Sequence, residues 1–147
     1  VQSVLFMCAY NAVRSPMAEA MAKHFFGKSV YVQSAGARRG DLDPLALAAC
    51  RANAELNEVT LGYSADFFAE QDRFDLIIVA DVLYDRANLP LLDHFLSRGQ
   101  QALVADSRVK DFQHPRYTRL ETLHARTWPD LGEPAEFRNV SLYHAQR

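Results

Sequence analysis

The chain opens with a short apolar run that is followed by a loop and a helix. Residues 4–7, Val-Leu-Phe-Met, form a continuous apolar run, which is typical of a strand buried in a parallel sheet. The loop of residues 8–15 follows at once. From Pro16 onward apolar side chains recur at helical spacing, with Ser15 placed as N-cap and Glu19 in the first turn. A strand, a tight loop and a helix in this order predict an α/β domain.

The middle of the chain continues the alternation of predicted strands and helices, whereas the last third is predicted to contain strands only. Helices are predicted from Asp43-Pro44 to near Asn57, and from Asn88 to Leu96 with Gly99 closing the second one. The last third alternates like strands, which predicts an antiparallel hairpin added to a parallel sheet. The predicted strands after the first are residues 30–34, 60–64, 74–80, 101–105, 119–125 and 138–144.

The composition of the chain favours a globular domain and argues against nucleic-acid-binding and membrane-spanning proteins. A chain of 147 residues with 49% hydrophobic and 23% charged residues is expected to form a single domain, residues 1–147. The net charge of -2, without a cluster of Lys and Arg, argues against nucleic acid as a partner. No apolar run approaches the ~20 residues of a membrane span. With two cysteines and no secretion signal, we expect a cytoplasmic monomer without metal.

The loop of residues 8–15 carries a Cys-x5-Arg pattern that fits the binding of phosphate or another small oxyanion. Backbone N–H groups of residues 9–15 at a helix N-terminus can surround a tetrahedral anion. The helix dipole and Arg14 favour the thiolate of Cys8, and Arg14 can grip two phosphate oxygens. Ser15 can donate to the sulfur, and Asn11 tolerates a left-handed backbone. The alternative is a buried cysteine before an ordinary N-cap, and Cys50 is interpreted as a core residue of the second helix.

The first forty residues resemble the low-molecular-weight protein tyrosine phosphatases. The matching pieces are Val-Leu-Phe-Met-Cys (4–8), Asn11, Arg-Ser-Pro-Met-Ala-Glu-Ala (14–20) and Gln-Ser-Ala-Gly (33–36). The resemblance implies that Cys8 is the nucleophile, Arg14 the phosphate clamp, and Asn11, Ser15 and Ser34 the network that shapes the loop. Val13 stands where many members carry a second cysteine.

The general acid of that family has no clear counterpart. The family ends with an Asp-Pro acid, whereas residues 129–134, Pro-Asp-Leu-Gly-Glu-Pro, match it only loosely. Asp130 or Glu133 could protonate a leaving group, and the alternative is that both are solvated turn carboxylates.

From about Asp41 the chain resembles the class I S-adenosylmethionine-dependent methyltransferases. The matching pieces are residues 41–54, 64–66 and 75–85. The resemblance implies vestigial cofactor contacts, with Asp41 at the ribose, Asp66 at the adenine and Asp81 near the reactive end. It also implies a three-layer Rossmann-like sheet of order 3-2-1-4-5-7-6 with strand 7 antiparallel. A phosphatase-like sheet would instead have the order 2-1-3-4-5.

Two resemblances that meet near Gly40 are most simply explained by an engineered hybrid of segments 1–40 and 41–147. The first functional hypothesis is phosphate binding with at most weak, cysteine-dependent hydrolysis of phosphomonoesters. The second is a non-catalytic scaffold for fold recombination. The third, methyl transfer, is disfavoured because Cys8 and the residues after it replace the glycine-rich turn that such a cofactor needs. We therefore expect no cofactor, S-adenosylmethionine included.

Overall fold

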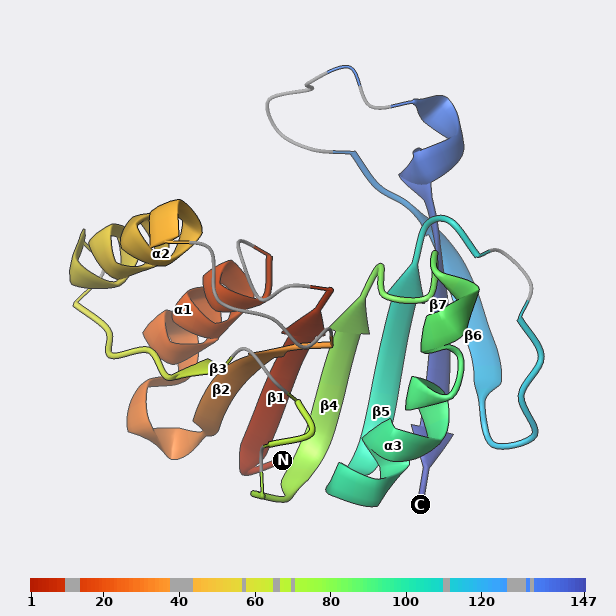
Figure 1. Ribbon diagram of the computed structural model, residues 1–147, viewed down its shortest axis with the longest axis horizontal. Coiled ribbons are helices and arrows are strands. Elements are labelled where there is room, and N and C mark those ends of the chain that lie inside the picture. The colour runs from red at the N-terminus through yellow and green to blue at the C-terminus, as the bar shows by residue number, and fades with distance from the viewer. Residues whose placement is uncertain are drawn as a thin grey trace.

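The computed structural model describes residues 1–9, 14–37, 44–56, 58–64, 67–69, 71–109, 112–126, 132 and 134–147. Seven strands and three α-helices lie in these ranges (Figure 1). The strands are β1 (Ser3–Cys8), β2 (Tyr31–Gly36), β3 (Tyr63–Ser64), β4 (Phe74–Ala80), β5 (Gly99–Asp106), β6 (Thr118–His124) and β7 (Asn139–Gln146). The helices are α1 (Arg14–Phe26), α2 (Pro44–Leu56) and α3 (Leu91–Arg98), with 3-10 turns η1 (Gly27–Ser29), η2 (Arg86–Asn88) and η3 (Ala135–Arg138).

The strands form one sheet of order β3-β2-β1-β4-β5-β7-β6. Strands β1 to β5 pair in parallel, and β7 is antiparallel to both β5 and β6. This confirms the Rossmann-like order expected from the sequence. The alternative order 2-1-3-4-5 is wrong, because the third strand along the chain lies outside β2 and not beside β1.

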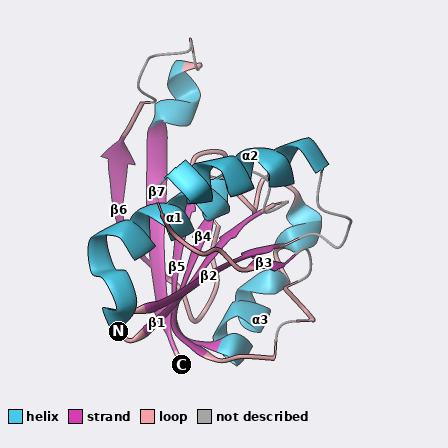
Figure 2. Ribbon diagram, turned by 90° about the vertical axis from the view of Figure 1, so that its left-hand side faces the viewer, coloured by secondary structure: helices cyan, strands magenta, loops and turns pink. Residues whose placement is uncertain are grey.

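Helices cover the sheet on both faces, as right-handed crossovers require when the chain reverses direction across the sheet. Helices α1 and α2 lie over one face and α3 over the other (Figure 2). The main core fills the α3 side, where Leu5 and Ile77 of the sheet are buried with Phe95 of the helix. The continuous apolar runs of β1 and β4 therefore became central strands, as their composition predicts.

Helix α1 begins two residues earlier than expected, at Arg14 in place of Pro16. Arg14 is its first residue, so Ser15 lies inside the first turn and is not the N-cap. The side chain of Ser15 turns toward Cys8 instead of capping the helix. Proline at position 16 is tolerated there because the N–H groups of a first turn have no partner within the helix.

Other helices and strands also begin or end at residues different from those predicted. The helix expected from Asn88 begins at Leu91, because the carboxylate of Asp85 accepts from the Ala87 N–H and stabilises the separate turn η2. Gly99 ends α3 and is also the first residue of β5. The third strand covers two residues where five were expected. None of the described helices has the length and hydropathy to cross a bilayer.

Candidate active site

Cys8 and Asp81 lie at the carboxyl ends of two neighbouring strands, at the point where the order of the strands in the sheet reverses. Cys8 ends β1, and Asp81 directly follows β4, the parallel neighbour of β1. From this pair of strands the chain winds outward to β2 on one side and to β5 on the other. In open α/β sheets ligands bind in the crevice at the carboxyl ends of the strands at such a switch point.

Cys8 and Ser15 are in contact at this end of the sheet. The Sγ atom of Cys8 and the Oγ atom of Ser15 lie 3.1 Å apart, and both residues are buried. The Cys8 carbonyl accepts from the Ala37 N–H at 3.0 Å, which fixes the end of β1 against the residue after β2. The predicted neighbours Tyr10, Asn11, Ala12 and Val13 lie outside the described residues, and Ala9 is buried beside Cys8.

Arg14, the predicted phosphate clamp, reaches toward β4. Its Nη1 atom donates to Oδ2 of Asp81 at 2.8 Å, and the Arg14 side chain is 49% exposed. The other carboxylate oxygen, Oδ1, accepts from both the N–H and the hydroxyl of Ser107. Sequence reasoning assigned Asp81 to a cofactor and missed its contact with Arg14. A carboxylate directly after the strand that adjoins β1 was the signal that could have found it.

Ser34, the predicted support of the loop, is fully buried on β2 beside Phe6 of β1. Its Oγ atom has no hydrogen-bond partner among the residues that the structure describes. Asn11, another member of the network expected around the loop, lies outside them. Burial fits a structural role for Ser34.

The second cysteine, Cys50, lies on a helix and not at the end of a strand as Cys8 does. Cys50 is buried on α2, as the sequence analysis expects of a core residue. Burial raises the pKa of the Cys50 thiol above its ordinary value, and the negative charges of Cys8 and Glu19 raise it further. A thiol with a raised pKa is a poor nucleophile at neutral pH.

Glu19 is a buried acid on α1, which the sequence analysis placed only in the first turn of the helix. Its side chain is fully buried, and its Oε1 atom accepts from Lys23 Nζ at 2.7 Å and from the Gly62 N–H at 3.2 Å. Lys23 Nζ also donates to the Thr60 carbonyl at 2.5 Å. These contacts join α1 to the segment before β3, so Glu19 supports the fold beneath the site.

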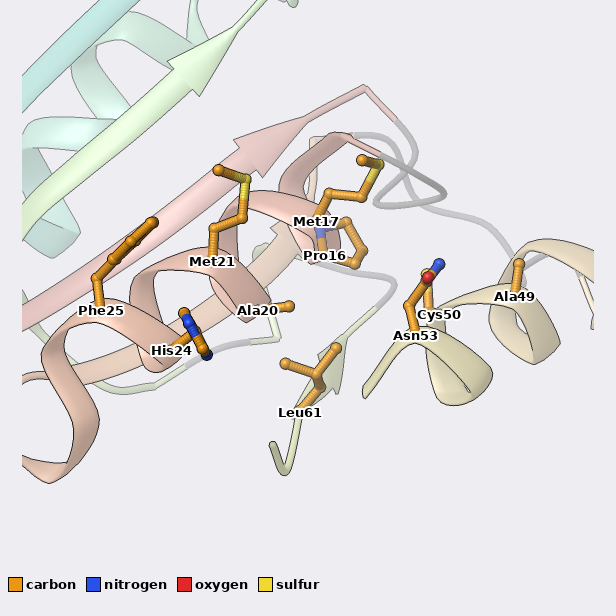
Figure 3. A pocket seen from close by; sticks show the side chains of 10 residues that line it. All are labelled: Pro16, Met17, Ala20, Met21, His24, Phe25, Ala49, Cys50, Asn53 and Leu61. Atoms are coloured by element: carbon orange, nitrogen blue, oxygen red, sulfur yellow. The ribbon is translucent and has the colours of Figure 1, made fainter. Parts of the chain in front are cut away.

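An apolar groove lies between α1 and α2 (Figure 3). Its volume is about 210 Å³, and Met17, Met21, Ala49 and Cys50 are among its lining residues. Met17 and Met21 are 51% and 58% exposed. The described residues that line the groove include no Lys or Arg, so this part of the groove is not suited to phosphate.

The remaining predicted site residues cannot be placed. Asp41, Asp66, Asp130 and Glu133 lie outside the described residues. Within the described ranges no group of His, Cys, Asp and Glu side chains is arranged to hold a metal ion.

Solved structures resemble the fold of the whole chain. MtNAS in complex with S-adenosylmethionine has 12% identity and a TM-score of 0.62 over 99% of this chain and 55% of that one. TrmN from Thermus thermophilus has 14% identity and a TM-score of 0.64 over 99% of this chain and 44% of that one. The chain thus spans about half the length of these proteins, and at such identities they show the fold alone.

A third solved structure is similar to only part of this chain. An arsenate reductase in the phosphate binding state has 25% identity and a TM-score of 0.41 over 54% of this chain and 60% of that one. No curated protein sequence matches the chain significantly.

The family comparison extends further than the resemblance of the first forty residues. The model described as low molecular weight phosphotyrosine protein phosphatase matches residues 3–103, which include β1, α1, β2 and β4. The chain therefore belongs to the low molecular weight phosphotyrosine protein phosphatase family.

Proposed function

We propose that the loop of residues 8–15 binds phosphate and supports at most slow, cysteine-dependent hydrolysis of phosphomonoesters. The observation that carries this proposal is the 3.1 Å contact between Cys8 Sγ and Ser15 Oγ at the first turn of α1. A sulfur at a helix N-terminus beside a hydroxyl donor is favoured as the thiolate. Membership of the phosphatase family supports the same assignment.

In the proposed reaction Cys8 is the nucleophile. Its thiolate attacks phosphorus, the bond from phosphorus to the ester oxygen breaks, and the leaving oxygen takes up a proton. Water then attacks the phosphocysteine, the sulfur–phosphorus bond breaks, and inorganic phosphate and the thiolate are released. Arg14 binds the phosphoryl oxygens, backbone N–H groups of residues 9–15 complete the anion site, and Ser15 donates to the sulfur.

The rate depends on the proton donor for the leaving group. Asp130 and Glu133 are the candidates, and neither stands in the sequence context of the family's acid. Loss of a general acid typically costs ~10²- to 10⁴-fold in rate. Aryl phosphates with an acidic leaving group need little protonation, so they are the best substrates to assay.

The test is hydrolysis of para-nitrophenyl phosphate between pH 5 and 7. Cys8→Ser should abolish turnover, whereas the matched control Cys50→Ala should retain it, because Cys50 is a buried residue of α2. Equal turnover in the protein and in Cys8→Ser, or none in either, would contradict the phosphatase proposal and leave the non-catalytic scaffold.

We further propose that the chain is an engineered hybrid in which residues 1–40 come from a phosphatase and residues 41–147 from a methyltransferase-like protein, although the match to the phosphatase family continues past this boundary to residue 103. The sheet order supports this origin, because a Cys-x5-Arg loop follows β1 in a sheet whose third strand lies outside β2. The groove between α1 and α2 lies where side chains of the two proposed segments meet.

The proposal that the chain is a hybrid can be tested by replacing its phosphatase-like segment with the corresponding segment of a methyltransferase. Replacement of residues 1–40 by the corresponding strand, glycine-rich turn and helix of a methyltransferase should give a folded protein that binds S-adenosylmethionine. A replacement that folds without binding the cofactor would contradict a methyltransferase origin for residues 41–147.

The described residues do not fit S-adenosylmethionine in the chain as it stands. Cys8 and Ser15 are in contact after β1, where close approach of the cofactor requires glycine. Asp81 is engaged by Arg14 and Ser107. Calorimetric titration with S-adenosylmethionine should therefore show no binding, and saturable heat would overturn this conclusion.

A further inference from the structure

We infer that Ser107 is a positioning residue for the phosphate clamp: it fixes Asp81, and Asp81 in turn orients Arg14. This inference rests on the proposed function, because it concerns how Arg14 is presented to phosphate. Ser107 directly follows β5, two strands away from Cys8 in the sheet, and belongs to neither set of site residues expected from the sequence.

Ser107 holds one carboxylate oxygen of Asp81 with two donors. The Ser107 N–H lies 2.9 Å and its hydroxyl 2.8 Å from Oδ1 of Asp81. Ser107 is itself buried, so its hydroxyl is not shared freely with solvent. Two hydrogen bonds to one oxygen fix the rotation of the carboxylate and direct Oδ2 toward Arg14.

The backbone of Asp81 is fixed as well. Its N–H donates to the Ala105 carbonyl of β5 at 2.9 Å, and its φ of 48° is in the left-handed region. Residues other than glycine seldom adopt this conformation, and aspartate is one of the few that tolerate it. Asp81 is therefore attached to the end of β5 by three hydrogen bonds, and Arg14 meets a rigid partner.

Of the three residues Ser107, Asp81 and Arg14, Arg14 has the longest and most mobile side chain. Its side chain is 49% exposed and can adopt many rotamers, and ordering such a side chain on binding costs affinity. The contact with Asp81 orders it before phosphate arrives. A guanidinium has five N–H donors, and the contact through Nη1 uses one of them, so a fork of donors is left for phosphate.

Asp81 could act on Arg14 in one of two ways, by orienting its guanidinium toward phosphate or by competing with phosphate for it. If Asp81 only occupied Arg14, its removal or release would strengthen phosphate binding. If Ser107 and Asp81 orient Arg14, their loss weakens it. The sign of the change in the dissociation constant of phosphate therefore distinguishes the two roles.

The experiment compares Ser107→Ala and Ser107→Thr in the full chain, with inorganic phosphate as the probe. Ser107→Ala loses the hydroxyl donor, and we expect its dissociation constant for phosphate to rise about three- to tenfold, the range of one ordinary hydrogen bond, because the hydroxyl acts on phosphate only through Asp81 and Arg14. Ser107→Thr keeps the hydroxyl and should bind phosphate within twofold of the original. The KM for para-nitrophenyl phosphate should follow the same pattern, with kcat changed less than KM.

A readout at Cys8 separates positioning from general damage to the fold. The rate of Cys8 alkylation by iodoacetamide should be unchanged in Ser107→Ala, because Ser15 and α1 still surround the sulfur. Should Ser107→Ala fail to fold, Asp81→Asn serves instead. Asparagine tolerates the positive φ and can accept both Ser107 hydrogen bonds, while it loses the charge that orders Arg14.

The outcomes distinguish failure of the positioning role of Ser107 from failure of the proposed phosphate-binding function. If the original chain binds phosphate and Ser107→Ala binds it equally well or more tightly, the positioning role is overturned and the proposed function stands. If Ser107→Ala and Ser107→Thr weaken binding alike, the hydroxyl is not responsible and the role is overturned. If the original chain neither binds phosphate nor turns over substrate, the proposed function fails and this inference fails with it.

Discussion

Lys23 Nζ lies 2.7 Å from Oε1 of Glu19, one helical turn away on α1, and the Glu19 carboxylate is fully buried. The pair also contacts the Gly62 N–H and the Thr60 carbonyl, so it connects the first helix to the segment that leads into β3. A buried carboxylate is tolerated only when its charge has a partner.

Removal of the lysine should therefore destabilise the fold. Lys23→Met leaves the Glu19 charge buried without its counter-ion, and we expect the free energy of unfolding to fall by about 3 kcal/mol. The double variant Lys23→Met with Glu19→Gln should recover part of this loss because the buried charge is gone. Urea denaturation of the single and double variants measures both values, and an additive result would show that the pair is not coupled.

Ser15 should affect the rate of phosphate transfer more than phosphate binding. Ser15→Ala removes the hydroxyl that lies 3.1 Å from Cys8 Sγ, and kcat for para-nitrophenyl phosphate should fall by about tenfold or more, the effect of one hydrogen bond to a charged group. Ser15→Thr retains a hydroxyl and should recover much of the rate. An unchanged alkylation rate of Cys8 in Ser15→Ala would show that this hydroxyl does not stabilise the thiolate.

Tyr117 should make the protein sensitive to alkali. Its hydroxyl donates to the Leu92 carbonyl at 2.8 Å, and burial raises the pKa of the phenol well above its ordinary value. The unfolded chain releases this proton near pH 10, whereas the folded chain retains it, so stability is unaffected below about pH 10 and decreases as the pH rises above it.

The expected slope for Tyr117 is about 1.4 kcal/mol per pH unit above pH 10. Tyr117→Phe should remove this contribution and, at pH 7, cost about 1 kcal/mol for the lost hydrogen bond. Thermal unfolding at pH 7 and at several values above pH 10 compares the two proteins. Parallel pH profiles would contradict the assignment.

The groove between α1 and α2 should accept a larger side chain. Ala49 lines the groove, and Ala49→Leu adds apolar contacts with Met17 and Met21 that should raise the free energy of unfolding by about 1 kcal/mol. Ala48→Leu is the matched control, because Ala48 is an exposed residue of the same helix that does not line the groove. Equal stability of the two variants would show that the groove gains nothing from being filled.

The elements of this fold could be predicted because their signals are local. The apolar runs that became β1 and β4 and the Pro44 that opens α2 each indicate their structure within a few residues. The strand order came from the family resemblance, since periodicity alone does not say which strands are neighbours. The pairing of Arg14 with Asp81 was missed for that reason, because it depends on β4 lying beside β1.

Burial on α1 was harder to predict than the helix itself. Met17, Met21 and Phe25 repeat at helical spacing, yet all three are more than half exposed. The buried side of the helix consists of smaller or polar residues, Pro16, Glu19 and Ala20 among them. Hydrophobicity indicates a helix, but close approach to the sheet required small side chains that hydrophobicity does not mark.

The central place of β1 has a consequence for how the chain folds. Strand β1 needs β2 on one side and β4 on the other, and Asp75 at β4 lies 72 residues after its partner Ser3. During synthesis the first two strands are complete well before β4 exists, so β1 keeps one edge unpaired. Long-range pairing of this kind slows folding and leaves an edge on which chains can associate. The yield of soluble protein will therefore depend on how quickly β4 reaches that edge as well as on the stability of the finished sheet.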